Sequence, residues 1–462
     1  MPNRQKDFLK YRDLHPTFIY ENFEYTINNK EVIVRFVFIL EGISLANSSL
    51  IRFEPTLHLP LPSSINKEDF QVEILENLLF HMGMVELISY WKAACPSKVI
   101  IKPYSLDEHQ IRFWKKLYWN GLGEFFYVNE IETTLDDFMQ ISSTSDRSVR
   151  ANSSPLEERI IVPIGGGKDS AVSLELLKAS GHELYPFIIN PRGASLNTVK
   201  QSGISESNLL VAKRSIDKTL LRLNEQGYLN GHTPFSAMLA FTSLLQAYLI
   251  QSKYIALSNE ASANEASIPG SHVNHQYSKT YEFEADFRSY YKKYISPEIE
   301  YFSFLRPLSE LQIACLFAQL DKHHFSFRSC NVGSKTDSWC GNCSKCLFTY
   351  IMLAPFLPEQ KLTAMLGENL IAKSSLAPVL KELQGLTTTK PFECVGTVDE
   401  VNLALYQAIQ HNDYSSSAIV INQDSTNNPN DARFKKALKD WNNAHFLPEF
   451  LVIILKKKLS TC

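Results

Sequence analysis

Alternating apolar and polar positions near the N-terminus predict a β-hairpin. In residues 23–38, apolar side chains recur at every second position on either side of Asn28-Asn29, which is the period of half-buried strands joined by a turn. Helical periodicity follows at 74–94 and 108–119, with Asn120-Gly121 as the expected C-cap of the second helix. The serine-rich stretch 142–157 then predicts a linker.

The central part of the chain alternates strand and helix patterns. Strands are expected at 160–164, 184–189, 254–257 and 301–305, and helices at 171–177, 234–251, 278–295 and 309–320. Such alternation predicts an α/β fold with a parallel sheet, whose ligands gather beyond the carboxyl ends of the strands. Beyond residue 355 the pattern is mostly helical, with candidates at 431–441 and 446–459. We therefore expect an α+β domain at 1–150, a central α/β domain at 151–355 and a helical region at 356–462.

Composition narrows the functional class. The chain has 462 residues, 44% hydrophobic, with a net charge of −3 and dispersed basic residues, which argues against a general nucleic-acid surface. The N-terminus lacks the apolar core of a signal peptide, and no apolar run approaches the roughly 18 residues of a membrane span. We expect a cytoplasmic enzyme without a membrane or nucleic-acid partner, and nothing indicates an obligate protein partner.

The most informative stretch is a strand pattern, three glycines and a helix pattern, at residues 160–177. Gly165, Gly166 and Gly167 lie at the expected turn, where a backbone without Cβ atoms can approach a ligand and point N–H groups at an anion. Ser170 would stand at the helix start, which favours phosphate. The sequence therefore predicts a nucleotide-phosphate loop.

The spacing rejects a Walker A loop, because Asp169 follows Lys168 and the required first glycine would fall on Val162. The stretch instead resembles the pyrophosphate loop, Ser-Gly-Gly-x-Asp-Ser, of the ATP pyrophosphatases, with Gly165 in place of the first serine. The resemblance implies ATP as a ligand. It also implies a pyrophosphate-loop domain of the adenine-nucleotide α-hydrolase type at residues 151–355.

A second constellation is formed by cysteines. Two residues separate Cys340 from Cys343 and Cys343 from Cys346, and nine residues separate Cys330 from Cys340. Four thiolates satisfy tetrahedral Zn²⁺ in a closed structural site, although an iron–sulfur cluster uses similar spacings. With eight cysteines in a chain of this length, we expect reduced thiols and a metal site in place of a disulfide framework, with Cys315 in the core.

Loop and cysteine cluster together resemble the queuosine-precursor synthases, but more of the chain is similar to the bacterial UDP-N-acetylmuramoyl-L-alanyl-L-glutamate epimerases. The blocks that carry this similarity are FHMGMVEL (80–87), VPIGGGKDS (162–170), LNGHTPFS (229–236), LSNEASA (257–263), VNHQYSK (273–279), LRPLSE (305–310), the segment 329–346, and KPFECVG (390–396). The family implies an isomerase of peptidoglycan precursor synthesis, and hence of cell-wall biogenesis, cell shape and cell division. Such an enzyme consumes ATP to invert the terminal glutamate of UDP-MurNAc-L-Ala-L-Glu from L to D.

That chemistry assigns expected roles to the loop. If the glutamate α-carboxylate attacks the α-phosphate of ATP, an acyl-adenylate forms, whose carbonyl can accept the charge left by loss of the α-proton. The loop N–H groups, Lys168 and Ser170 would hold the departing pyrophosphate, and Asp169 would hold Mg²⁺. Asn190, which follows the second strand, is a further candidate ATP contact.

The acid and base are sought first at His275 and Lys279, with Glu260 and His232 as further candidates. His275 and Lys279 are four residues apart and would share a face if a helix already begins there. His275 could equally be structural or a phosphate ligand. The candidates expected to bind substrate are His232, Asn259, Asn274 and Arg306. Two other functions remain open: a pyrophosphate-loop synthetase that adenylates a nucleobase or another carboxylate, and an inactive nucleotide-binding regulator.

Overall fold

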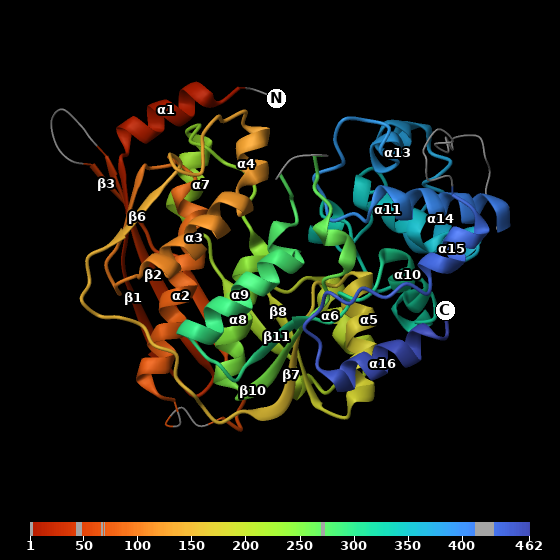
Figure 1. Ribbon diagram of the computed structural model, residues 1–462, viewed down its shortest axis with the longest axis horizontal. Helices are drawn as coiled ribbons and strands as arrows, with labels where there is room; N and C mark the ends of the chain where they lie inside the picture. The colour runs from red at the N-terminus through yellow and green to blue at the C-terminus, as the bar shows by residue number, and fades with distance from the viewer. Residues whose placement is uncertain (1–2, 43–48, 66–67, 69, 269–272, 412–428) are drawn as a thin grey trace. The chain divides into compact units, whose positions relative to one another are not determined.

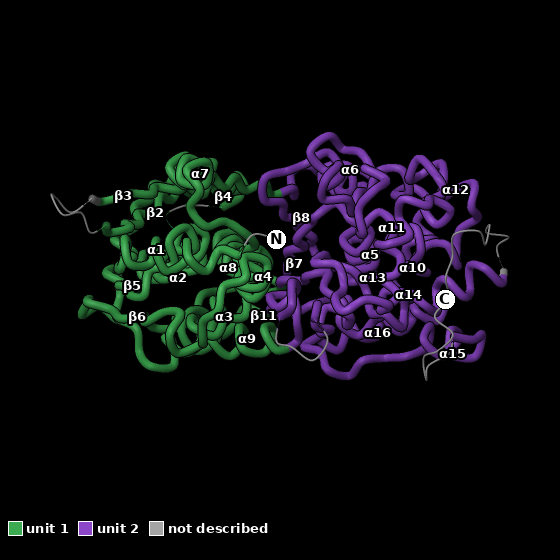
Figure 2. Tube along the Cα trace, turned by 90° about the horizontal axis from the view of Figure 1, so that it is seen from above, with its two compact units in different colours: residues 1–158, 210–254, 282–300 green, residues 159–209, 255–281, 301–462 purple. Residues whose placement is uncertain are grey.

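The computed structural model describes residues 3–42, 49–65, 68, 70–268, 273–411 and 429–462. The chain forms two compact units, coloured separately in Figure 2. Unit 1 comprises residues 1–158, 210–254 and 282–300, and unit 2 comprises residues 159–209, 255–281 and 301–462. Neither unit is a single stretch of sequence. The three-region division expected from the sequence stays a prediction.

Unit 1 is built on a mixed sheet (Figure 1). Its strands are β1 (Thr17–Ile27), β2 (Glu31–Gly42), β3 (Ser49–Phe53), β4 (Thr56–Pro60), β5 (Lys98–Ile101), β6 (Gln140–Ser143) and β9 (Leu210–Arg214). Their order is β9-β4-β2-β1-β5-β6, and β3 pairs with β2. The pairs β1–β2, β2–β4 and β4–β9 are antiparallel, whereas β1–β5 and β5–β6 are parallel. The predicted hairpin around Asn28-Asn29 is confirmed as β1 and β2.

The helices of unit 1 are α1 (Gln5–Leu14), α2 (Val72–Trp91), α3 (Glu108–Gly121), α4 (Gly123–Val128), α7 (Lys218–Glu225), α8 (Phe235–Leu249) and α9 (Tyr281–Tyr294). Helix α2 is buried along almost its whole length and packs on β1, β2 and α8. The block at 80–87 lies in this helix: a Cβ on Gly83 would stand 1.9 Å from the Tyr20 hydroxyl, and His81 contacts the Tyr290 hydroxyl at 3.0 Å. This block therefore builds the core of unit 1.

Two expected boundaries in unit 1 were wrong. Helix α3 continues through Gly121 and is capped by Leu122. A Cβ on Gly121 would lie 2.6 Å from the Pro234 ring, so this glycine permits close packing and does not end the helix with a left-handed turn. The serine-rich stretch also begins inside β6, which reaches Ser143.

Unit 2 holds the strand order β11-β10-β7-β8, formed by β7 (Glu157–Pro163), β8 (Glu183–Ile189), β10 (Ser252–Leu257) and β11 (Glu300–Ser303). β7 and β8 are parallel. Its helices are α5 (Lys168–Leu177), α6 (Gly193–Ser202), α10 (Glu310–Ala318), α11 (Ser344–Leu353), α12 (Glu359–Leu366), α13 (Ala377–Leu383), α14 (Val398–His411), α15 (Asp431–Ala437) and α16 (Glu449–Leu459). The strand–helix alternation is confirmed, and the described residues beyond 355 form helices and no strand.

Helix α5 is central to unit 2, because it packs against α6, α10 and α16. Eight of its ten residues are buried, which matches its short apolar pattern. The sequence did not predict α6, whose composition is polar and whose first residue is a glycine. Among the described helices, none is long and apolar enough to cross a membrane.

Candidate functional site

The glycine loop joins β7 to α5, as the sequence predicts. Gly166 has a φ of +88°, and a Cβ there would lie 2.6 Å from the backbone nitrogen of Ser195 in α6. Its carbonyl accepts a hydrogen bond from the Arg328 N–H at 2.8 Å. A Cβ on Gly167 would approach the Ser329 hydroxyl to 3.1 Å. The loop is therefore held between the first turn of α6 and the segment that leads to the cysteine cluster.

Ser170 lies in the first turn of α5 and is buried. Its Oγ accepts a hydrogen bond from the Gly166 N–H at 3.2 Å and donates to the Gly167 carbonyl at 3.0 Å. The helix begins at Lys168, three residues before the expected range of 171–177. In this arrangement Ser170 closes the loop on itself, and its expected contact with phosphate stays a prediction.

Lys168 contacts two carboxylates. Its ammonium donates to Asp169 and to Glu310, the first residue of α10, and both Lys168 and Glu310 are buried. Burial by itself would lower the pKa of Lys168, but the carboxylates of Asp169 and Glu310 outweigh that effect and the pKa is raised. Lys168 therefore stays charged. Sequence reasoning missed Glu310, although it ends the block LRPLSE, and its helix starts with the capping pair Ser309 and Gln312.

Two further acids lie close to this pair. Glu400, from α14, accepts a hydrogen bond from the Glu310 N–H at 2.7 Å. Burial raises the pKa of Glu310 well above its usual value; Lys168 opposes this, and the charges of Asp169, Glu260 and Glu400 add to it. Two ammonium groups, those of Lys168 and Lys279, thus lie among these carboxyl groups. Carboxyl oxygens are the ligands that hard divalent cations prefer.

Arg306 and the two asparagines expected to bind substrate make contacts within the protein. The Arg306 side chain is fully buried and donates to the carbonyls of Glu260 and Lys279 and to the Ser303 hydroxyl. Asn259 donates to the same hydroxyl at 3.0 Å, and Asn274 donates to the Ala263 carbonyl at 3.0 Å. These residues fix the loops that follow β10 and β11, and their contact with substrate stays a prediction.

His275 and Lys279 do not share a helical face, because α9 begins only at Tyr281 and a short 3-10 turn covers Tyr277–Lys279. They nevertheless meet at one atom. The Lys279 ammonium donates to the sulfur of Cys394 at 3.1 Å, and the His275 side chain is hydrogen-bonded to the same sulfur. Cys394 belongs to the block KPFECVG at 390–396, to which sequence reasoning assigned no role.

The two remaining candidates are His232 and Asn190. His232 belongs to unit 1, where its imidazole lies 3.5 Å from the Glu124 carboxylate. Asn190 directly follows β8 and is exposed, with a φ of +51°. Their expected roles in binding substrate and ATP stay predictions.

The four predicted metal ligands converge. The sulfurs of Cys330, Cys340, Cys343 and Cys346 all lie within 4.8 Å of one another. Individual separations are 3.4 Å for Cys343–Cys346, 3.7 Å for Cys340–Cys346 and 3.8 Å for Cys330–Cys343. Tetrahedral zinc with bonds of 2.3 Å places its sulfurs roughly 3.8 Å apart. Gly341, with a φ of +64°, forms the turn between two of the ligands.

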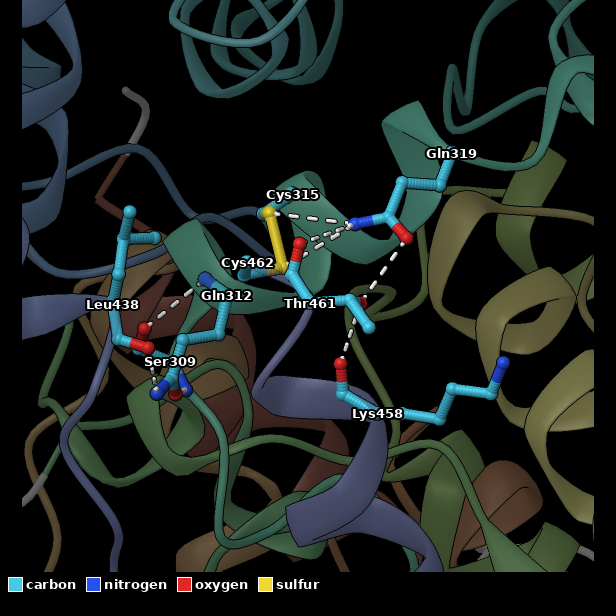
Figure 3. Close-up of a disulfide and its surroundings, with 8 residues drawn as sticks. All are labelled: Ser309, Gln312, Cys315, Gln319, Leu438, Lys458, Thr461 and Cys462. Carbon is cyan, nitrogen blue, oxygen red and sulfur yellow. Dashed lines mark hydrogen bonds between the residues drawn. A yellow bond between two sulfur atoms is a disulfide. The ribbon is translucent and has the colours of Figure 1, made fainter.

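The expectation that all thiols are reduced was wrong. Cys315 of α10 and the C-terminal Cys462 form a disulfide (Figure 3). Around it, Gln319 exchanges hydrogen bonds with Thr461, and Gln312 donates to the Leu438 carbonyl at 3.1 Å. The two cysteines are 147 residues apart and meet because α16 packs beside α10. Cys315 is buried, as expected.

Comparison with known proteins covers most of the chain. The MurL N-terminal domain matches residues 10–304, and the MurL C-terminal domain matches residues 326–438. A Micromonospora protein is 34% identical over 375 residues, which span 80% of this chain and 83% of the relative. A Xanthomonas oryzae pv. oryzae protein is 34% identical over 347 residues, 73% of this chain and 76% of the relative. Both are named UDP-N-acetyl-α-D-muramoyl-L-alanyl-L-glutamate epimerase, an isomerase. The chain therefore belongs to the MurL family of UDP-N-acetyl-α-D-muramoyl-L-alanyl-L-glutamate epimerases and is an isomerase.

Proposed function

We propose that this protein inverts the terminal glutamate of UDP-MurNAc-L-Ala-L-Glu from L to D through an acyl-adenylate, with release of AMP and pyrophosphate. The family supplies the reaction and substrate class. The observation that supports the adenylate route is the buried cluster of Lys168, Asp169 and Glu310 beside the glycine loop. It combines a fixed ammonium, a carboxylate and a loop backbone at one helix N-terminus, the groups that phosphoryl chemistry uses.

Formation of the acyl-adenylate makes the glutamate α-proton easier to remove. An α-proton next to a carboxylate is hard to remove, because its loss creates a dianion. Once the α-carboxylate oxygen has attacked the α-phosphorus and pyrophosphate has left, the neutral acyl carbonyl can take up the electron pair of the broken Cα–H bond. A proton returns on the opposite face, and hydrolysis then releases the D-glutamate product and AMP.

The residues of the cluster have separate tasks in this scheme. Lys168 and the N–H groups at the start of α5 hold the β- and γ-phosphates, where negative charge grows as pyrophosphate leaves. The carboxyl groups of Asp169, Glu260, Glu310 and Glu400 would supply the hard oxygen ligands that Mg²⁺ prefers. When bound, the cation would neutralise charge on the phosphates. On the same grounds we assign residues 151–355 to the pyrophosphate-loop class.

The cysteine cluster is assigned a structural role. Sulfurs that lie within 4.8 Å of one another close around a single ion, whereas an iron–sulfur cluster spreads its thiolates over several iron atoms. We infer bound zinc, with all four positions taken by protein and none left for substrate. Because Ser329 and Arg328 precede this site and contact the glycine loop, the metal would fix one wall of the loop.

One incubation tests the proposed function. The protein is mixed with ATP, Mg²⁺ and UDP-MurNAc-L-Ala-L-Glu in heavy water, and AMP, pyrophosphate, glutamate chirality and α-deuterium are measured. We expect D-glutamate that carries deuterium, formed together with AMP. Asp169→Asn should abolish both products, whereas Asp321→Asn, at an exposed aspartate, should leave them unchanged. D-glutamate without deuterium, or AMP formed only with another acceptor, would contradict the proposal.

A further inference from the structure

Cys394 is a reactive group near the carboxylate cluster. Its sulfur accepts a hydrogen bond from the Lys279 ammonium at 3.1 Å and is bonded to the His275 side chain. Lys345, from the first turn of α11, adds a second positive charge close by, and Glu393 is the negative neighbour. Cys394 itself is half-buried. A thiol among these groups is set up to ionise.

The electrostatic balance favours the thiolate. Burial would raise the pKa of Cys394, but the charges of Lys279 and Lys345 and the hydrogen bond from His275 outweigh it and lower the pKa to about 5. Burial would lower the pKa of Lys279, yet Cys394, Glu260 and Asp169 together raise it. At neutral pH this is an ion pair, in which the sulfur is kept charged and can accept a proton.

The pair lies near the start of α5. The charges of Cys394 and Asp169 both raise the pKa of Lys279, and Asp169 lies in the first turn of α5, so the sulfur lies near the groups that are proposed to hold ATP and Mg²⁺. The glutamate α-carbon is one bond away from the carboxyl carbon that is joined to the α-phosphate. A base for this carbon must therefore stand beside the nucleotide site.

We propose that Cys394 is the catalytic base that removes the glutamate α-proton, with Lys279 and His275 as positioning residues for its sulfur. This inference rests on the proposed function. The S–H bond forms as the Cα–H bond breaks, and the electron pair moves into the acyl-adenylate carbonyl. The α-carbon then takes a proton from solvent on its opposite face, and the Cys394 thiol gives its own proton back to solvent.

Replacement of Cys394 should separate the two halves of the reaction. With Cys394→Ala and Cys394→Ser, we expect adenylation, followed as AMP and pyrophosphate formation, to persist within a few-fold. The rates of D-glutamate formation and of α-deuterium incorporation in heavy water should fall by about 100-fold or more, which is the usual rate contribution of a positioned base. The serine variant retains a hydrogen-bond acceptor for Lys279, and the same measurements are made on it if the alanine variant does not fold. Cys95→Ala, which removes a buried thiol of unit 1, should leave both halves unchanged.

The outcomes distinguish the inference from the function on which it rests. Wild-type protein that makes no D-glutamate contradicts the proposed function. Wild-type activity together with full epimerisation by both Cys394 variants contradicts the inference alone. A covalent substrate adduct on Cys394 after acid quench would also overturn it, because the sulfur would then be a nucleophile that forms a thioester.

The positioning role of Lys279 is tested by pH. In the wild type, epimerisation should persist at pH 6.5, where an ordinary thiol is almost fully protonated, and it should fall only as pH drops toward 5. Lys279→Met removes the facing charge, so the acid limb of kcat/KM should move upward by one pH unit or more. A uniform loss of activity at every pH, with the limb in its original place, would contradict this role.

Discussion

The neighbouring glycines of the β7–α5 loop differ in what surrounds them. Gly165 is exposed, and nothing lies within 4 Å of a Cβ placed there. Gly166 combines a φ of +88° with a backbone atom of α6 only 2.6 Å from its Cβ position. Gly166 is therefore required by its dihedral angle and by packing, whereas Gly165 is required by neither.

Substitution of these glycines should give opposite results. Gly166→Ala would force an alanine into a left-handed dihedral and would displace α6. We therefore expect a loss of about 1–3 kcal/mol in the free energy of unfolding and little AMP formation. Gly165→Ala and Gly165→Ser should remain close to wild type in urea unfolding and in AMP formation. A large gain of activity in Gly165→Ser would instead indicate that the missing serine degrades the loop.

Glu175, on α5, gives a pH-dependent contribution to stability. Its carboxylate contacts His323, Lys322 and Lys178. Burial would raise the pKa of Glu175, but these hydrogen bonds outweigh it and lower the pKa to about 2. A lowered folded-state pKa stabilises the protein above the unfolded value, roughly pH 4.5, and this contribution is lost as pH falls from there toward 2. The ionised form is thus the stabilising one.

Glu175→Gln should accordingly destabilise the protein near pH 7 and less so in acid. The expected measurement is the free energy of unfolding from urea titrations of both proteins between pH 7 and pH 3. The gap between wild type and variant should narrow as pH falls through 4.5. Glu157→Gln, at an exposed acid of β7, is the control. A gap that is constant with pH would show that the ion pairs contribute nothing.

At the scale of elements, α10 joins distant parts of unit 2. Its first residue, Glu310, contacts Lys168 of α5, and its middle residue, Cys315, is bonded to the C-terminus (Figure 3). Gln312, between them, donates to the carbonyls of Leu438 and Asp440. The C-terminal segment thereby fixes the helix that presents a carboxylate to the glycine loop.

Loss of the disulfide should destabilise the protein. A crosslink over 147 residues restricts the unfolded chain, and its removal typically costs about 2–4 kcal/mol. We expect this drop in the free energy of unfolding for Cys462→Ser, and the same drop for wild type with reductant. Reductant should not destabilise the variant further. If the denatured wild type titrates as many thiols before reduction as after it, the disulfide is not formed.

At the scale of the whole molecule, the two units differ in how their cores are held. Unit 1 encloses aromatic side chains around α2, among them Trp91 and Trp114, which are fully buried. In unit 2, the thiol cluster gathers residues from 330 to 346 at the start of α11. Metal bound there would contribute folding energy to unit 2 directly.

Removal of the metal should therefore affect the units unequally. Elemental analysis should find one zinc per chain, and a strong chelator should lower the melting temperature of unit 2 in calorimetry while the unit 1 transition stays in place. Cys343→Ser should contain less zinc and should respond little to the chelator. Iron with sulfide in place of zinc would contradict the assignment.

Features were predictable from the sequence when the residues that form them lie close together along the chain. The hairpin of β1 and β2, the strand–loop–helix of β7 and α5, and the four cysteines are each encoded within a few turns of chain, where periodicity and spacing act directly. α6 was missed because its polar composition carries no clear period. Gly121 was misread because its role depends on Pro234, more than a hundred residues away.

The sequence by itself determined the α/β alternation, the glycine loop between β7 and α5, the cysteine cluster and the family. Tertiary structure alone decided which groups complete the site. Glu310 meets Lys168 across 142 residues, Cys394 meets Lys279 across 115, and Cys315 meets Cys462 across 147. Single acids and thiols at such separations have no pattern of their own, because a parallel sheet and its covering helices bring them together only after the chain has packed.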